Sequence, residues 1–178
     1  SVGGDPHFWL NPFLAKEQAQ KITDGFTKLD PASKEYYEAN QKNLNERLDE
    51  IDKRYKESLA NCRQDLVVTS HAAFGYLANR YAFDQVSIAG ISPEEEPSPQ
   101  NLIQVSKFVK DNNIEYIFFE TLVSPRLSET IAKETGAKTL VLDPIEGLSQ
   151  EDMAKGKDYF TLMEQNLENL VIALECTR

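Results

Sequence analysis

The chain has 178 residues, which is long enough for one full domain or for one domain with an appendage. Its net charge of −10 at pH 7 repels nucleic-acid phosphates and leaves no basic stripe for them to follow, which argues against a nucleic-acid partner. The hydrophobic fraction of 40% is ordinary for a globular protein, and the sequence contains no apolar run long enough to span a bilayer.

The N-terminal part of the sequence predicts two helices. After Pro12, apolar residues recur at helical spacing as far as Leu29, and Asp30-Pro31 ends this helix and starts another. In the second helix, of about thirty residues, one narrow apolar stripe runs from Tyr37 to Leu59. The rest of its surface is charged, so this helix is expected to be a solvated strut between two bodies.

From Asp65 onward the pattern changes to alternating strands and helices. The expected strands are 66–69, 85–89, 114–119 and 139–142, and the expected helices are 72–81, 99–112, 125–135 and one terminal helix from about Ser149. This alternation is typical of an α/β fold in which a parallel sheet carries helices on both faces.

Metal-binding side chains follow three of the four expected strands. His71 comes after the first strand, Glu120 after the third, and Asp143 and Glu146 after the fourth. Because ligands of parallel sheets bind beyond the carboxyl ends of the strands, these residues are candidates for one site. The second strand is followed by the acidic run 94–96, which is interpreted as a solvated loop rather than a metal cluster.

His7 and His71 are the only histidines, and each lies at the edge of an expected element. Imidazole is the commonest protein ligand for zinc, but a histidine at a strand end is often a hydrogen-bonded structural residue, so spacing alone leaves both interpretations open. Glu120 fits a metal ligand, an acid/base group or a carboxylate that orients a neighbour. Of Asp143 and Glu146, one is expected to reach the site, because the proline between them disfavours an arrangement in which both turn inward.

The two cysteines, Cys62 and Cys176, are too far apart in sequence for a zinc knuckle or a redox pair. They could form one disulfide if the segments that carry them meet, and an extracytoplasmic location would permit it. Two unrelated buried thiols are the alternative, and the sequence leaves both open.

Four motifs resemble the zinc and manganese solute-binding proteins of bacterial ABC importers. They are DPHFWLNP at 5–12, TSHAAFGYLA at 69–78, IAGISPEEEPSP at 88–99 and FFE at 118–120. The resemblance covers nearly the whole chain and is greatest to the zinc-specific branch, which includes streptococcal adhesin-type lipoproteins. It implies a clamshell of two α/β lobes bridged by one long rigid helix, with metal held between the lobes.

On this resemblance the chain divides into three parts. Residues 1–30 are a remnant of the first lobe, 31–62 form the linker helix, and 63–178 form the metal-binding second lobe. The sequence starts where the second half of the family's sequence starts, so the chain is expected to be a truncated or proteolysed piece. The leader, the lipid-attachment cysteine and the histidine-rich loop that similar proteins often carry are expected to lie outside it.

The resemblance assigns His7, His71 and Glu146 as the metal ligands, with Asp143 as the alternative carboxylate. A further histidine in the family's first lobe has no counterpart here, which leaves at most three protein ligands. Two imidazoles and one carboxylate suit Zn²⁺, whereas Mn²⁺ is less favoured because it is better served by more oxygen ligands.

The resemblance implies an extracytoplasmic receptor, lipid-anchored at the cell surface or periplasmic, that delivers Zn²⁺ to an ABC transporter permease and catalyses no reaction. Two alternatives stay open. One is a zinc-dependent hydrolase with Glu120 as base, although the sequence has no HExxH motif and no nucleophile elbow. The other is an adhesive or structural module in which the histidines are incidental.

Overall fold

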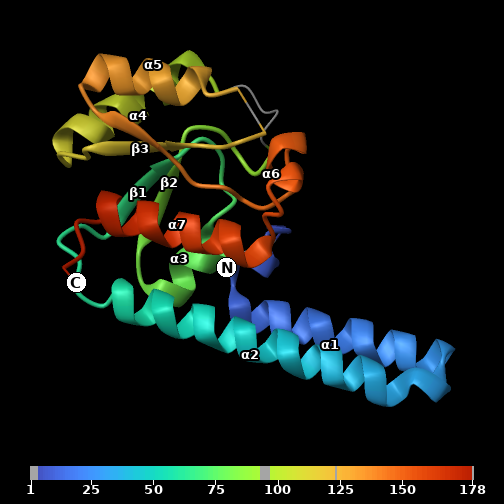
Figure 1. Cartoon of the computed structure of the whole chain (residues 1–178). Coiled ribbons are helices and arrows are strands. Elements are labelled where there is room, and N and C mark those ends of the chain that lie inside the picture. Colours follow the sequence, from blue (N-terminus) through green and yellow to red (C-terminus); the bar gives the residue numbers. More distant parts are fainter. Residues whose placement is uncertain (1–3, 93–96, 123, 178) are drawn as a thin grey trace.

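The structure is a computed structural model and describes residues 4–92, 97–122 and 124–177, so the expected acidic loop at 94–96 lies outside the described residues. Figure 1 shows a sheet with helices on both faces and a long helical hairpin that extends from this body. Within the described ranges, no helix combines the length and the apolar character needed to cross a bilayer.

The sheet has four parallel strands in the order β2-β1-β3-β4. The strands are β1 (Leu66–Thr69), β2 (Asp84–Ser87), β3 (Tyr116–Phe119) and β4 (Lys138–Val141). The chain therefore builds the sheet first on one side of β1 and then on the other, and the order reverses between β1 and β3. Such a reversal is where open α/β sheets place their ligands. The parallel α/β fold predicted from the sequence is confirmed.

Helices cover both faces of the sheet, as predicted, and each face has its own buried cluster (Figure 1). On one face, α3 (Gly75–Tyr81) packs with the C-terminal helix, and the cluster includes Phe74, Leu77, Phe118, Met163 and Leu170. On the other face, α4 (Pro99–Asp111) and α5 (Arg126–Thr135) pack on the sheet, and the cluster includes Val68, Ile88, Val109, Ile117 and Ile131.

The prediction of a single terminal helix from about Ser149 is wrong. The segment forms α6 (Gln150–Ala154) and α7 (Tyr159–Ala173), separated by a turn. Gly156 in this turn has a φ of +69°, which favours glycine and ends the first helix. Asp158 then starts the second one, because its side chain accepts a hydrogen bond from the backbone N–H of Thr161.

The hairpin consists of α1 (Pro12–Leu29) and α2 (Lys34–Ser58), joined by a short 3-10 helix, η2 (Pro31–Ser33). The C-terminal half of α2 packs on the α/β body: Leu48, Ile51 and Tyr55 are buried, and the Tyr55 hydroxyl donates to the carbonyl of Met163 at 2.7 Å. The N-terminal half of α2 pairs with α1, and these two helices project together from the body (Figure 1).

A disulfide between Cys62 and Cys176 joins the segment just after α2 to the segment after α7, so the first of the two alternatives for these cysteines is confirmed. The two residues also form an isolated antiparallel bridge, and their Cα atoms are 3.8 Å apart, closer than the usual 4.4 Å or more. The covalent link therefore fixes the base of the hairpin to the C-terminal edge of the body.

Candidate metal centre

Three predicted residues converge at the carboxyl end of the sheet. His7 lies directly before the 3-10 helix η1 (Phe8–Leu10), His71 lies just beyond β1, and Glu146 lies in the loop after β4. One ligand atom from each residue lies within 4.8 Å of the others. His7 and Glu146 are 139 residues apart in sequence, and the fold brings them together.

Each histidine is held by a carboxylate on its Nδ1 atom. Asp5 accepts a hydrogen bond from the His7 backbone N–H at 2.9 Å, and its same Oδ1 atom lies 2.7 Å from Nδ1 of the ring. Glu120 Oε1 lies 2.6 Å from Nδ1 of His71 and also accepts a hydrogen bond from Ser70 Oγ. A carboxylate on one ring nitrogen fixes the orientation and the tautomer of an imidazole and makes the other nitrogen a better metal ligand.

The two Nε2 atoms face the centre. His7 Nε2 lies 3.0 Å from Glu146 Oε1, and the centroids of the two imidazole rings are 5.3 Å apart. Both histidines are only 1% exposed, and among the described residues His71 Nε2 has no hydrogen-bond partner. A buried polar atom without a partner costs free energy. A metal ion between these atoms would satisfy it.

Glu120 and Asp143, the other strand-end carboxylates, are engaged elsewhere. Glu120 is 3% exposed and contacts His71 on the side of the ring opposite Nε2, so it orients the histidine. Asp143 accepts hydrogen bonds from Thr121 Oγ1 at 2.5 Å and from the Ile145 backbone N–H at 2.7 Å. These bonds shape the loop that carries Glu146 and occupy both oxygens of Asp143.

The loop after β4 has an unusual backbone at Ile145, which has a φ of +56°. A β-branched residue in this region is an outlier and costs about 1–3 kcal/mol, so surrounding contacts must hold it. On the N-terminal side, Asn166 bonds both the N–H and the carbonyl of Asp143, at 2.8 and 2.7 Å. The loop is thereby fixed to α7, and Glu146 follows directly.

Some residues around the centre have no role assigned in the sequence analysis. Asp5, Trp9 and Tyr159 bond to a proposed ligand or to a segment that carries one, and Ser70 bonds to Glu120, which contacts His71. Asp5 could have been recognised, because an aspartate two residues before a histidine can reach its Nδ1. The others depend on contacts between distant segments, which the pattern does not reveal.

Two imidazoles and a carboxylate that meet beyond the carboxyl ends of parallel strands form an arrangement typical of metal-binding sites. The family described as "Zinc-uptake complex component A periplasmic" matches residues 2–173, and the chain belongs to this family. The resemblance predicted from the four motifs is confirmed. The family is one of transport components rather than of enzymes.

Two relatives show how much of a longer protein the chain corresponds to. It is 43% identical over 166 residues to the high-affinity zinc uptake system protein ZnuA of Bacillus subtilis, covering 93% of this chain and 52% of that protein. The zinc-binding lipoprotein AdcA of Streptococcus pneumoniae is also 43% identical, with 93% of this chain and 33% of that protein covered. The chain therefore spans about half or less of these relatives.

Solved structures share the fold. The laminin-binding protein Lbp of Streptococcus pyogenes superposes with a TM-score of 0.87 at 39% identity, over 96% of this chain and 65% of that one. The Zn(II)-bound ZnuA-like domain of Streptococcus pneumoniae AdcA gives a TM-score of 0.84 at 41% identity, over 98% and 66%. In both comparisons about a third of the solved chain has no counterpart here.

Proposed function

We propose that this chain is the metal-binding part of an extracytoplasmic receptor that captures Zn²⁺ and delivers it to the permease of an ABC transporter. The observation that carries the proposal is the convergence of His7, His71 and Glu146 at the switch point, with ligand atoms within 4.8 Å of one another. The family and the zinc-bound structure of a relative support the same metal.

The proposed ligands are Nε2 of His7, Nε2 of His71 and a carboxylate oxygen of Glu146. The Nδ1 atoms of both histidines are engaged with Asp5 and Glu120, which leaves the Nε2 atoms for the metal: that of His7 contacts Glu146, itself a proposed ligand, and that of His71 has no partner among the described residues. Two nitrogens and one oxygen match the ligand set of zinc, which takes four ligands in a tetrahedron. Water or a further protein segment would supply the fourth ligand. Mn²⁺ would bind more weakly, because it favours carboxylate, carbonyl and water oxygens.

Transport without chemistry is the better interpretation of this centre than hydrolysis. A hydrolase would need a base that faces a metal-bound water. Glu120, the candidate for that base, contacts the Nδ1 side of His71 and accepts a second hydrogen bond from Ser70. Its role in the proposal is to hold the histidine in place for reversible binding.

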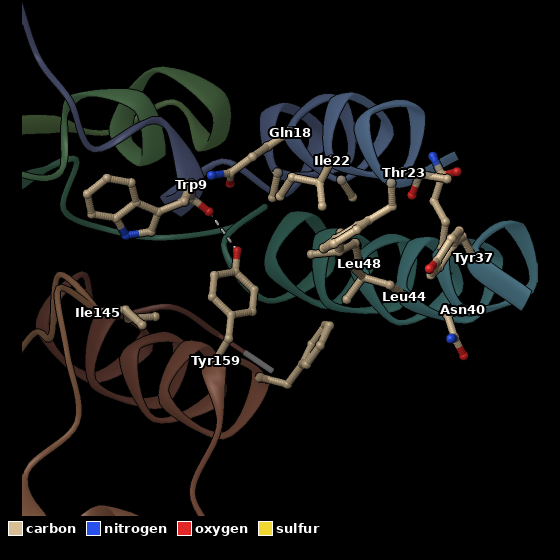
Figure 2. Close-up of a pocket in the computed structure, with 15 residues that line it drawn as sticks. Trp9, Gln18, Ile22, Thr23, Tyr37, Asn40, Leu44, Leu48, Ile145 and Tyr159 are labelled. Atoms are coloured by element: carbon tan, nitrogen blue, oxygen red, sulfur yellow. Dashed lines mark hydrogen bonds between the residues drawn. The ribbon is translucent and has the colours of Figure 1, made fainter. Parts of the chain in front are cut away.

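The proposed organisation keeps residues 1–30, 31–62 and 63–178 as the end of one lobe, a linker and a second lobe. It is supported by an apolar groove of about 550 Å³ between the hairpin and α7, shown in Figure 2. Ile22 and Phe26 line it and are 51% and 52% exposed. Exposed apolar surface of this extent is expected where another part of a longer protein packs.

Zinc titration with a competing chelator tests the ligand set. We expect His71→Ala and Glu146→Ala each to lower the affinity by at least about 100-fold, more than the 10- to 100-fold typical of residues that only support a ligand. Asp143→Ala tests the alternative carboxylate, because the loss of a residue that is not a ligand should lower the zinc affinity less. Glu115→Ala, at the opposite end of β3, is the matched control and should leave the affinity unchanged. Unchanged zinc affinity in His71→Ala would refute the proposed centre.

A further inference from the structure

We infer that Trp9 is a positioning residue that sets the separation between His7 and Glu146 by tying together the two segments that carry them. This inference rests on the proposed function, because it concerns the zinc affinity of that centre. Trp9 is not itself a metal ligand, because its indole N–H can only donate a hydrogen bond.

Trp9 and Pro144 lie at the same distance in sequence from the two ligands that they connect. Trp9 follows His7 by two residues, and Pro144 precedes Glu146 by two residues. The indole N–H of Trp9 donates to the Pro144 carbonyl at 2.9 Å, across a sequence separation of 135 residues. One ligand segment is thereby bonded directly to the other, just outside the centre.

A second bond holds the backbone of the same residue. The Tyr159 hydroxyl, at the start of α7, donates to the Trp9 carbonyl at 2.8 Å, as the dashed line in Figure 2 shows. Burial raises the pKa of Tyr159, so its hydroxyl keeps its proton and stays a donor at neutral pH. Trp9 is therefore fixed to the α/β lobe through its side chain and through its main chain.

Glu146 is the proposed ligand that most needs such a restraint. The two histidines are buried and each is bonded to a carboxylate, whereas the Glu146 side chain is 33% exposed and its contact is with His7, a proposed ligand itself. Ile145, directly before it, has the strained φ of +56°. The Trp9 bond to Pro144 holds one side of this strained residue, and Asp143 holds its backbone N–H at 2.7 Å.

A purely structural role for Trp9 has to be separated from a positioning role, because its ring also lines the apolar groove and packs against the core. Trp9→Phe keeps an aromatic ring at this position and removes the donor to Pro144. Tyr159→Phe removes the donor to the Trp9 carbonyl and keeps its ring. Both variants preserve most of the apolar contact, so thermal unfolding can confirm that they are folded before zinc is added.

The test is a double-mutant cycle of zinc affinity with Glu146→Ala. We expect Trp9→Phe to weaken zinc binding about 5- to 10-fold in the native background, somewhat below the range for residues bonded directly to a ligand, and less than about 2-fold in the Glu146→Ala background. Tyr159→Phe should show the same pattern with a smaller loss. A positioning residue loses its effect when the residue it positions is gone.

Three results would overturn the inference. An unchanged zinc affinity in Trp9→Phe means that the bond to Pro144 does not set the site. An equal loss in both backgrounds means that Trp9 acts on the fold and not through Glu146. If Glu146→Ala alone leaves zinc affinity unchanged, the proposed ligand set fails, and this inference fails with it.

Discussion

The α/β lobe and the α1–α2 hairpin bury their apolar residues in different ways. In the lobe, Phe74, Ile117 and Phe118 are at most 1% exposed, and each sheet face has its own cluster. In the hairpin, Phe26 is 52% exposed and Leu29 is 85% exposed. The lobe therefore has a closed core, whereas the hairpin keeps apolar surface that its own described residues do not cover.

The proposed metal centre joins these two regions. His71 and Glu146 come from the lobe, and His7 comes from the segment that leads into α1. Leu10, between His7 and the hairpin, is fully buried in a cluster of the lobe and anchors this segment. Zinc affinity is therefore expected to depend on the junction between the regions as well as on the ligands.

The largest expected effect contrasts a lobe phenylalanine with a hairpin phenylalanine. Phe118→Ala should lower the free energy of unfolding by about 3–5 kcal/mol, because it leaves a cavity in a closed core. Phe26→Ala should cost less than about 1 kcal/mol, mainly through its stacking on Tyr37, whose ring centroid is 5.4 Å away. Urea unfolding of both variants measures the difference. Equal losses would show that the groove is covered in solution and would break the comparison.

The disulfide should contribute nearly as much as a core residue. Cys62 and Cys176 are 114 residues apart in sequence, and closing so long a loop restricts the unfolded chain. A variant with both cysteines changed to alanine should lose about 2–4 kcal/mol of stability, measured by urea unfolding. Adding reductant to the native protein should reproduce this loss, and reductant should not affect the variant. A loss below about 1 kcal/mol would mean that noncovalent contacts alone fix the hairpin base.

The elements with clear local signals were predictable from the sequence. The strand at 66–69 and the helix that begins at Pro12 have the predicted bounds, because each combines an apolar pattern with an unambiguous start or stop residue. The helix expected from Ala72 begins at Gly75 instead, and the Ala72 backbone N–H donates to the Gly90 carbonyl at 2.8 Å. The terminal segment forms two helices in place of the one predicted, because Gly156, with its positive φ, interrupts it.

The candidate site was predictable in its histidines and less so in its supporting contacts. His7 and His71 were singled out because they are the only histidines and lie at element edges. The preference for Glu146 over Asp143 came from the family resemblance, and whether Glu146 binds metal stays a prediction. The Trp9 bond to Pro144 was not predictable, since it depends on how segments 135 residues apart meet.

A third prediction compares the two histidine supports across the junction. Glu120→Gln on the lobe side and Asp5→Asn on the hairpin side each remove a negative charge from Nδ1 of a proposed ligand. Each should weaken zinc binding about 10- to 100-fold, or about 1.4–2.7 kcal/mol, measured by chelator competition. Similar losses mean that the lobe and the hairpin side contribute equally to the zinc affinity. No loss in either variant would contradict the assigned role of these carboxylates, and thermal unfolding without zinc controls for misfolding.

The smallest expected effect concerns an ion pair that holds α2 against α3. Asp52 accepts hydrogen bonds from Nε and Nη2 of Arg80 at 2.6 and 2.8 Å and from the Tyr81 hydroxyl at 2.8 Å. Burial by itself raises the pKa of Asp52, but the hydrogen bonds from Arg80, Lys56 and Tyr81 outweigh it and lower the pKa from 3.8 to about 2. The folded state thus favours the ionised carboxylate.

Because the folded-state pKa is the lower one, the stability contributed by Asp52 is fully present above about pH 4 and is lost as the pH falls towards 2. Asp52→Asn should lower the free energy of unfolding at pH 7 by about 1–2 kcal/mol, a value reduced for partial solvent screening. The difference between native protein and variant should shrink between pH 4 and pH 2, as measured by urea unfolding at each pH.

Lys16, which pairs with the more exposed Asp49 at 2.6 Å, provides the matched control: Lys16→Met should cost less than about 1 kcal/mol. A pH-independent difference for Asp52→Asn would show that its effect comes from shape rather than charge, and that the junction does not depend on this ion pair.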